Sequence, residues 1–513
     1  MPLKQKDPMN HSSSQRTWHG QDARGTSALI LLCVLCVSAV NVFAADKPKG
    51  STLNGGPDDV YHFESLPEPE ESKGLEIGGM GWTADGKLAL CTRHGEVWLR
   101  SENGDWKRFA SGLHECLGLY PGDSKGELFV MQRTELTKIT DTDGDGEADK
   151  FETFNNSWGY NGNYHQFAFG LIKDKGGNFC GTLCLAHKPD NSGGIYMGTQ
   201  KETPYRGCSF KITPKGEFIP FSYGLRAPNG IAMNEAGDLF ASDNQGEFVP
   251  VGSIHHLTEG AFHGHPSSLI FKKGWTRPLN TVTDAEWDKM RKWPAVLMPY
   301  PQMGHSQGCP IFDTVGEKFG PFAGQMFIGD VIDPLIMRIT LEKVQGEFQG
   351  ACYPFMKRDE IKGSNRLLFH PDGSLYVGIT DRGWSRGSTG LQKITWTGKM
   401  PFEIKEMSLA KGGFDLTFTQ PVDPVTGNDP RSYNLNCWHY KYGRQYGSPD
   451  LDKASVPITA VKLSADNTKA SLTIESLHDK QWIYYLSADG IKNAEGGSLR
   501  NKEVYYTLNR LKE

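Results

Sequence analysis

The chain has 513 residues, which is too long for one ordinary domain and fits two or three. Charged residues make up 22% and aromatic residues 11%, so the composition excludes a disordered chain and a coiled coil. The formal net charge of −5 excludes nonspecific electrostatic binding of nucleic acid over a broad surface, because such binding needs a basic surface. Glycine is abundant, with 60 residues and no collagen period, which favours many short strands joined by tight turns.

Residues 1–44 predict a secretory signal peptide. A weakly basic stretch precedes an apolar run from Ala28 to Val40, and Ala44 and Ala45 then offer a cleavage site. An uncleaved anchor is the alternative, but the run is short for a membrane span of about 20 residues. Residues 45–60 are expected to form a linker. We therefore expect an exported protein, periplasmic or extracellular, with no membrane span once the signal is removed.

One sequence pattern occurs six times between residues 61 and 397. Each repeat has a turn glycine followed by a short apolar strand, and a second strand with a similar ending comes next. The turn glycines are Gly86, Gly126, Gly177, Gly237, Gly324 and Gly373. A unit of four short strands that recurs every ~40–50 residues is typical of a β-propeller blade. The pattern predicts a six-bladed β-propeller over residues 61–397.

An acidic loop covers residues 141–152. Its carboxylates occupy positions 1, 3, 5, 7, 9 and 12 of a twelve-residue calcium loop, with a glycine at position 6 for the sharp turn. These are Asp141, Asp143, Asp145, Glu147, Asp149 and Glu152. Because the loop follows a strand, we expect a hairpin elaboration that holds a structural Ca²⁺. The alternative is an aspartate-rich turn without an ion.

Two regions depart from the repeat. The segment from Thr258 to Phe322 is an insertion rich in histidine and aromatic residues, which predicts either an elaboration that builds a site or a packed lid. Within it, His305 is a candidate acid/base residue, with a packing role as the alternative. Residues 398–513 alternate as strands and predict a small immunoglobulin-like β-sandwich without a catalytic constellation. The expected fold class is therefore all-β, a six-bladed propeller followed by this sandwich.

Four segments carry a resemblance to a known family. They read GYNGNYHQFAFGLIKDKGGNFCG (159–181), GLRAPNGIAMNEAGDLFASDNQG (224–246), GAFHGHP (260–266) and SNRLLFHPDGSLYVGITDRG (364–383). They resemble the glucose/sorbosone dehydrogenase propellers of the soluble quinoprotein type, over most of residues 75–397. With its C-terminal sandwich, the chain is similar to exported bacterial propellers of the "membrane-bound dehydrogenase" kind. The resemblance implies a calcium-assisted oxidoreductase that uses pyrroloquinoline quinone (PQQ) on a sugar or a related alcohol or aldehyde.

The resemblance also implies roles for individual residues. It makes His165 the base that takes the substrate's hydroxyl proton, which suits a histidine because its pKa lies near operating pH. It makes Arg226 the clamp on the cofactor's carboxylates, with Asn229 beside it, and it assigns Gly246 to the calcium ion. The alternatives are a structural histidine at position 165 and an ion pair that links blades at position 226. The chain departs from the family pattern after the histidine, at residues 243–246, and at Ala227.

Four further arginines are candidates for the cofactor on our own inference. They stand at the ends of predicted blade strands, where loops meet the axial opening: Arg93, Arg133, Arg366 and Arg382. Three functions stay open at this point. They are a PQQ-dependent oxidoreductase with a separate electron acceptor, a non-redox carbohydrate lyase or hydrolase, and a glycan-binding propeller without turnover. In each the expected ligand is a small or polymeric carbohydrate.

Overall fold

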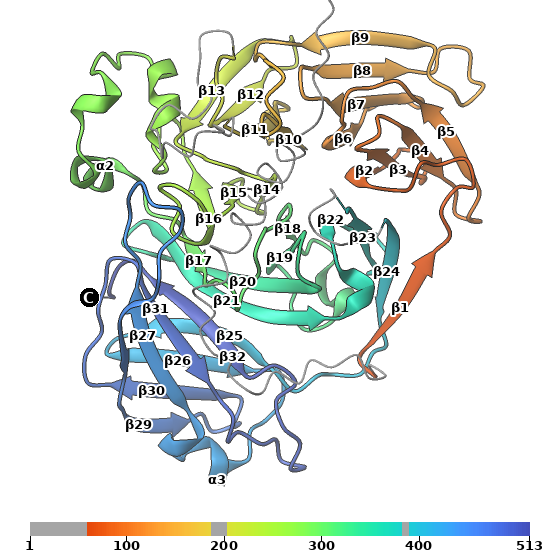
Figure 1. Cartoon of the computed structure of the whole chain (residues 1–513). Coiled ribbons are helices and arrows are strands. Elements are labelled where there is room, and N and C mark those ends of the chain that lie inside the picture. The colour runs from red at the N-terminus through yellow and green to blue at the C-terminus, as the bar shows by residue number, and fades with distance from the viewer. Residues whose placement is uncertain (1–58, 186–202, 382–388, 513) are drawn as a thin grey trace, which may run out of the picture. The chain divides into compact units, whose positions relative to one another are not determined.

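The computed structural model describes residues 59–185, 203–381 and 389–512, and all of these belong to one compact unit, Leu53–Glu513 (Figure 1). The predicted signal peptide, all but the last two residues of the linker, and Arg382 lie outside the described residues. Among the residues described, no helix has both the length and the apolar character that crossing a membrane requires. The eight cysteines of this part are all unpaired thiols.

The protein is all-β, and the predicted six-bladed propeller is confirmed. Five blades each use four consecutive antiparallel strands. The first comprises β2 (Ile77–Trp82), β3 (Leu88–Thr92), β4 (Val97–Arg100) and β5 (Trp106–Ala110). The second comprises β6 (Gly118–Pro121), β7 (Glu127–Met131), β8 (Leu136–Thr140) and β9 (Lys150–Asn155). The third comprises β10 (Ala168–Lys173), β11 (Phe179–Leu183), β12 (Cys208–Ile212) and β13 (Phe218–Tyr223).

The fourth and fifth blades follow the same order. The fourth comprises β14 (Ile231–Met233), β15 (Leu239–Asp243), β16 (Gly252–Leu257) and β17 (Val296–Met298). The fifth comprises β18 (Ile311–Phe312), β19 (Met326–Gly329), β20 (Leu335–Val344) and β21 (Glu347–Lys357). In these five blades the first strand is innermost, because β2, β6, β10, β14 and β18 contact one another in succession around the axis.

The sixth blade closes the ring with a strand from the other end of the propeller. It comprises β22 (Ser364–Phe369), β23 (Leu375–Ile379) and β24 (Gly390–Trp396), and β1 (Tyr61–Leu66) supplies its outermost strand. β1 pairs antiparallel with β24, with Tyr61 opposite Trp396 (Figure 1). Closure by this pairing covers the exposed edge of the last blade and ties the two ends of the ring together.

The six turn glycines of the sequence pattern all precede the second strand of a blade. Their φ angles are positive, from 76° at Gly126 and Gly324 to 99° at Gly237 and Gly373. A residue with a Cβ is strained in this region, which explains why glycine recurs there. The strands that follow are buried on both faces, as in β3, where all five residues are buried. The sequence pattern therefore marks one fixed position in each blade, one strand out from the axis.

The segment between Thr258 and Phe322 is only partly an insertion. It contains the last strand of the fourth blade, β17, and the first strand of the fifth, β18. The remaining part is helical, with η2 (Pro266–Phe271), η3 (Leu279–Thr281), α2 (Asp284–Met290) and η4 (Gly316–Phe319). α2 begins with a capping box between Thr283 and Glu286. Its Trp287 is fully buried, so the elaboration packs on the propeller as an ordered layer.

The C-terminal strands form a β-sandwich that shares a sheet with the fifth blade. One sheet has the order β25 (Ile404–Ala410), β26 (Gly413–Phe418), β30 (Lys469–Ile474) and β29 (Ile458–Leu463). The other strands are β32 (Glu503–Leu508), β31 (Trp482–Ser487), β27 (Asn434–His439) and β28 (Leu451–Ser455). They extend the fifth blade, because β32 pairs with β21. Phe414, Leu472 and Tyr506 lie in the core between the sheets.

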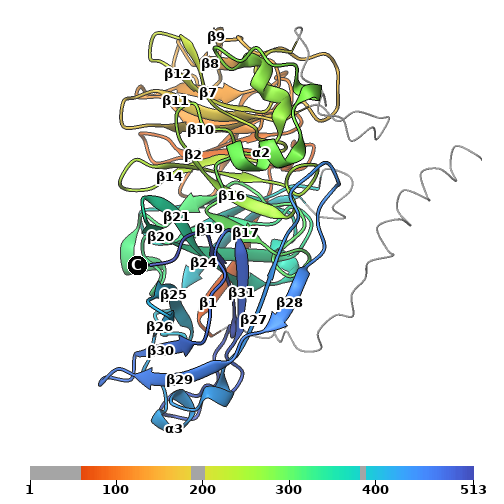
Figure 2. The same cartoon turned by 90° about the vertical axis from the view of Figure 1, so that its left-hand side faces the viewer.

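Three short helical turns complete the described elements: η5 (Asp359–Ile361), α3 (Pro424–Gly427) and η6 (Pro430–Ser432). Figure 2 shows β27, β28 and β31 extending away from the propeller sheets. The boundary at residues 397/398 and the immunoglobulin-like type of the sandwich stay predictions. The shared sheet means that the two parts are joined by a continuous hydrogen-bonded ladder as well as by the chain.

Candidate functional site

A cavity of about 350 Å³ lies among blades 3, 4 and 5, on the face where the loops between blades meet the axis. Four residues singled out from the sequence line this cavity together: His165, His305, Arg226 and Asn229. Phe167, Phe169 and Tyr446 add aromatic surface to the lining. Among the described residues, the lining includes no aspartate or glutamate. The arrangement therefore offers cationic and aromatic groups to a ligand, without a carboxylate that would repel an anion.

Arg226 lies between β13 and β14, and its guanidinium is only partly used by the protein. Nε donates to Oε2 of Glu247 at 2.9 Å, and Nη1 donates to the carbonyl of Gln245 at 3.2 Å. Nη2 has no hydrogen-bond partner among the described residues. A Cβ on Gly246 would come within 1.9 Å of Nε, so only glycine admits the guanidinium at this place. The side chain is thus fixed on one edge and has one nitrogen left for a ligand.

Asp243, at the end of β15, holds the backbone of this arginine. Its Oδ2 accepts from the amide of Arg226 at 2.8 Å, and its Oδ1 accepts from the amide of Ala227 at 2.7 Å. Burial raises the pKa of Asp243 to about 6, against the lowering effect of these two hydrogen bonds. No role for Asp243 was predicted from the sequence, where it belongs to the segment 243–246 that differs from the family's motif. Its role here is to orient the loop that carries Arg226.

His305 lies in the loop between β17 and β18 and is paired with a carboxylate. Its Nδ1 is hydrogen-bonded to Oδ2 of Asp333, and its ring meets Tyr300 edge-on at 4.6 Å. Burial lowers the pKa of His305, but the hydrogen bond to Asp333 and the charge of Asp330 outweigh this and raise it above the usual value. Nε2 has no hydrogen-bond partner among the described residues. The imidazole is therefore oriented on one side and available on the other.

Asp330 forms the base of the same cluster. Its Oδ2 accepts from the amides of His305 and Ser306, both at 2.8 Å, and its Oδ1 accepts from the amides of Ile332 and Asp333. The carboxylate is fully buried, and burial raises its pKa to about 6. Neither Asp330 nor Asp333 was predicted from the sequence. The segment Gly329-Asp330-Val331-Ile332-Asp333, directly after an apolar strand, is the signal that would have found them.

His165 lies in the loop between β9 and β10 and is the first residue of the described cavity lining along the chain. Its amide donates to Oδ1 of Asn163 at 3.0 Å, and its ring lies 5.9 Å from that of Phe167. Arg133 braces this loop by donating to the carbonyl of Tyr164 at 2.9 Å, and its guanidinium lies 4.2 Å from the ring of Phe167. Arg133 is also paired with a carboxylate, so it supports the loop and is outside the lining.

A fully buried arginine that no sequence motif revealed supports the same loop. Arg206 donates to the carbonyls of Gly159 and Phe167, at 2.6 and 2.7 Å. Burial lowers the pKa of Arg206 to about 9, and the nearby charge of Arg133 adds to this lowering. The loop that carries His165 is thus held by two arginines from other connecting segments, Arg133 and Arg206, which gives it a defined position at the cavity.

Arg366, on β22, is the arginine that the protein uses most completely. Its Nε donates to the carbonyl of Gly78 at 2.6 Å, and its Nη2 donates to the carbonyl of Leu117 at 3.0 Å. Its Nη1 reaches Oδ1 of Asn229 at 3.0 Å. These acceptors belong to blades 1, 2 and 4, so Arg366 ties four blades at the axis and supports Asn229 from outside the cavity lining.

Of the other two candidate arginines, only Arg93 can be placed relative to the site. Arg93 is ion-paired with Glu76, with Nη2 2.9 Å from Oε1, and it lies outside the lining. Arg382 lies outside the described residues. Asn229 does line the cavity, but its Nδ2 donates to the carbonyl of Gln307 and to Oδ1 of Asn365, both at 3.1 Å. Arg226 is thus the one arginine in the described lining of the cavity.

The residues present fit a planar anionic group such as PQQ, but not a calcium ion at the position that the resemblance implies. The free Nη2 of Arg226, the aromatic rings and a described lining without acidic residues suit a carboxylate-bearing ring system. The carbonyl of Gly246 accepts a hydrogen bond from the amide of Gly447 at 3.2 Å, and no carboxylate in the described lining could complete a calcium shell.

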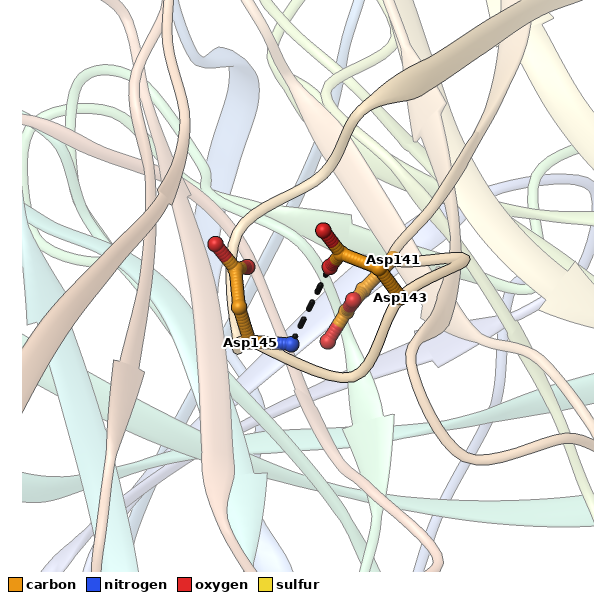
Figure 3. Close-up of side chains that lie close together, drawn as sticks. All are labelled: Asp141, Asp143 and Asp145. Carbon is orange, nitrogen blue, oxygen red and sulfur yellow. Dashed lines mark hydrogen bonds between the residues drawn. The ribbon is translucent and has the colours of Figure 1, made fainter.

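The acidic loop brings three of its six predicted ligands together. Asp141, Asp143 and Asp145 have carboxylate oxygens within 4.8 Å of one another (Figure 3). The others are not part of this group: Asp149 accepts from Thr142, and Glu152 lies on β9, paired with Lys150. Asp141 also accepts from the amides of Gly144 and Gly146, at 2.7 and 2.9 Å. The loop is ordered by these hydrogen bonds, with a cluster of three carboxylates at its tip.

Comparisons with known proteins give one family and a set of structures. The family described as "Domain of unknown function (DUF7133)" matches residues 104–379. A search of curated proteins found no match. Among solved structures, the chain is similar to a putative oxidoreductase (glucose dehydrogenase) from Thermus thermophilus, with 16% identity and a TM-score of 0.48. That match covers 65% of this chain and 99% of the other.

Two further structures have a similar degree of likeness. The PQQ-bound form of aldose sugar dehydrogenase from Streptomyces coelicolor has 12% identity and a TM-score of 0.45, covering 66% of this chain and 99% of that one. The holo form of the pyranose dehydrogenase PQQ domain from Coprinopsis cinerea has 14% identity and a TM-score of 0.48, covering 66% and 98%. At this identity the likeness concerns the fold, and the roles of individual residues depend on the geometry above.

Proposed function

The chain belongs to the DUF7133 family, and we propose that it is an exported, PQQ-dependent oxidoreductase acting on a sugar or a related alcohol or aldehyde. One observation carries the proposal. His165, His305 and Arg226 line a single cavity, in which Nη2 of Arg226 is unpartnered among the described residues and His305 is paired with a carboxylate. A base, an anion-binding group and an aromatic wall in one cavity are the parts that alcohol oxidation needs.

Arg226 is the proposed cofactor-binding residue. When bound, PQQ would supply a two-electron acceptor for the hydride that leaves the substrate's carbon. Nη2 of Arg226 would hold a carboxylate of that group, while Nε stays on Glu247 and Nη1 on the carbonyl of Gln245. Because the guanidinium is already oriented by these two contacts, little side-chain freedom is lost when the ligand binds.

His305 is the proposed proton acceptor. Nε2 of His305 would take the substrate's hydroxyl proton, and the two electrons would pass with the hydride to the bound quinone, so that the alcohol would lose two electrons and two hydrogens in all. The hydrogen bond from Nδ1 to Asp333 fixes the tautomer and stabilises the imidazolium that forms. His165, which the resemblance makes the base, lies in the same lining and is proposed to hold the substrate's hydroxyl group.

Three further parts of the proposal concern what lies outside the cavity. We propose export, since the predicted signal peptide is the basis for it. A separate electron acceptor is proposed, because each turnover leaves two electrons that must be passed on. A structural Ca²⁺ is proposed at Asp141, Asp143 and Asp145, away from the cavity, where it would order the loop.

A non-redox carbohydrate enzyme is the second candidate. The observation that favours it is the engaged carbonyl of Gly246, which removes the calcium contact that the resemblance implies. His305 with Asp333, and Arg226 beside them, would serve a lyase or hydrolase on a charged glycan without any cofactor. A glycan-binding propeller without turnover would use the same cavity and leave the His305–Asp333 pair without a reaction.

Reconstitution of the purified protein with PQQ and calcium tests the proposal. An artificial dye should be reduced when a sugar is added, and the melting temperature should rise with the quinone alone. Absence of both effects rejects the oxidoreductase. A lyase would instead raise the ultraviolet absorbance of uronate-containing polysaccharides, and a binding propeller would be retarded in an affinity gel that contains glycan.

A further inference from the structure

The loop between β27 and β28 carries an aromatic residue to the cavity from the C-terminal part of the chain. Figures 1 and 2 both show this loop reaching back to the neighbourhood of β16. Its Tyr446 lines the cavity together with Arg226, although the two residues belong to different parts of the fold. The cavity that the propeller builds is therefore incomplete without the C-terminal strands.

Backbone hydrogen bonds fix this loop against the segment that follows β15. The amide of Phe248 donates to the carbonyl of Gly443 at 2.7 Å, and the amide of Gly447 donates to that of Gly246 at 3.2 Å. The amide of Ser448 donates to the carbonyl of Pro250 at 3.0 Å. Phe248 is buried with a φ of 61°, an unusual value for a residue with a side chain. Such a conformation persists only where the surroundings determine it, which indicates a rigid contact.

Side chains hold the same loop to the helical elaboration. The hydroxyl of Tyr442 donates to the carbonyl of Gly264 at 2.6 Å, and the guanidinium of Arg291 lies 4.4 Å from the ring of Tyr442. Arg444 donates from Nε to Asp284 of α2 at 2.9 Å. With both flanks anchored, the backbone at residue 446 has a fixed position over the propeller.

Tyr446 itself is anchored through its backbone and exposed at its side chain. It forms a β-bridge with Glu247, the residue that pairs with Arg226, and its ring lies 5.1 Å from the guanidinium of Arg226. The residue is 64% exposed, which is high for a large aromatic side chain that is so well tethered. Its hydroxyl group makes no hydrogen bond among the described residues, and the exposed ring is available to contact a ligand in the cavity.

We propose that Tyr446 is the sugar-stacking residue of the cavity, whose exposed ring receives the C–H face of a pyranose ring. The inference rests on the proposed function, in that it assigns a carbohydrate to the same cavity. The free face of the tyrosine ring carries the negative quadrupole that attracts C–H groups, and the tethered ring provides apolar area at little entropic cost. The C–H face of the sugar packs on Tyr446, and its hydroxyl groups turn toward the two histidines.

Calorimetric titration with D-glucose and with cellobiose tests the inference, on the whole chain without its signal peptide. Tyr446→Ala is expected to weaken binding by about tenfold, which corresponds to ~1.4 kcal/mol. Tyr446→Phe keeps the ring and is expected to stay within about twofold of the unaltered protein. Phe151→Ala removes another exposed aromatic ring, on β9, and is the matched control with unchanged binding. Melting curves establish that each variant is folded.

Several results would overturn the inference. They are unchanged affinity in Tyr446→Ala, an equal loss in Tyr446→Phe and Tyr446→Ala, or a protein that binds neither sugar. A parallel titration with PQQ separates this inference from the proposed function. Sugar binding that depends on the ring of Tyr446, in a protein that binds no quinone, would retain the stacking residue and reject the oxidoreductase.

Discussion

The cavity at blades 3 to 5 and the axial region at blades 6, 1 and 2 use arginine in opposite ways. All three guanidinium nitrogens of Arg366 donate hydrogen bonds to protein acceptors, among them the carbonyls of Gly78 and Leu117, and these bonds tie the blades together at the axis. In Arg226, Nε donates a hydrogen bond to Glu247 and Nη1 donates one to the carbonyl of Gln245, so Nη2 is available to a ligand in the cavity. Two arginines near one axis can therefore be a structural tie and a ligand clamp, and their hydrogen-bond partners make the difference.

The largest effect is expected at the structural tie. Arg366→Ala should lower the free energy of unfolding by roughly 3–5 kcal/mol, because buried carbonyls lose a charged donor. Chemical denaturation measures this. Arg93→Ala, which breaks only the partly exposed pair with Glu76, is the control and should cost less than about 1 kcal/mol. Equal losses in the two variants would contradict the assignment of Arg366 as the tie.

The next effect is expected at the clamp. Arg226→Lys should lower kcat/KM for sugar oxidation by about 100-fold, because a lysine cannot serve Glu247 and a ligand carboxylate from a planar fork. The stability loss should be smaller than that of Arg366→Ala. Dye-coupled turnover and denaturation on the same preparations measure both quantities. A variant that keeps full activity would remove the distinction between the two arginines.

The same comparison extends to His305, whose partner Asp333 favours the protonated ring. Because its pKa lies above 6.5, the proposed base becomes active as pH rises through that raised value. Asp333→Asn should lower the maximal rate by about tenfold and move the rising limb of the profile to lower pH. The pH dependence of kcat/KM measures this. An unshifted limb would show that another group is the base.

Protein stability should depend on pH in the opposite direction to activity: activity rises with pH, whereas the stability contributed by His305 falls. A histidine with a raised pKa contributes stability that is fully present below its ordinary value of 6.5, and this is lost as pH rises through the raised pKa. Asp333→Asn should therefore destabilise the protein more at acidic than at alkaline pH. Denaturation at two pH values on either side of neutrality gives the comparison.

The smallest effect is expected at the acidic loop, whose aspartates are not part of the described cavity lining. Millimolar calcium should raise the melting temperature by about 2 °C, as a weakly bound structural ion does. Asp143→Asn combined with Asp145→Asn should abolish the rise, and magnesium serves as the control ion. A rise that survives in the double variant would mean that calcium binds elsewhere.

The blades could be predicted from the sequence, because each second strand follows a glycine with positive φ, as at Gly86 and Gly373. The closure could not, since β1 has no such glycine and its pairing with β24 depends on contacts between the two ends of the ring. The segment from Thr258 to Phe322 resembles a pure insertion in sequence because its two strands, β17 and β18, are only three and two residues long.

Four of the eight catalytic or cofactor-binding residues expected from the sequence line the cavity. Arg226, Asn229, His165 and His305 share the cavity, as expected for residues in loops at one face of a propeller. Arg93, Arg133 and Arg366 have the same kind of position in the sequence but meet carboxylates or carbonyls of the protein. Those partners are distant in sequence, so no local pattern reveals them. Tyr446 was missed for the same reason, because its place depends on the docking of a loop from the sandwich.

The most direct test of the central assignment is an equilibrium titration of PQQ into the unaltered protein, Arg226→Ala and Arg93→Ala, followed by quenching of tryptophan fluorescence. We predict saturable binding of one quinone per chain in the unaltered protein and in Arg93→Ala, and its loss in Arg226→Ala. Binding that is absent throughout, or equal in the two variants, would contradict a quinone site at the Arg226 side of the axis.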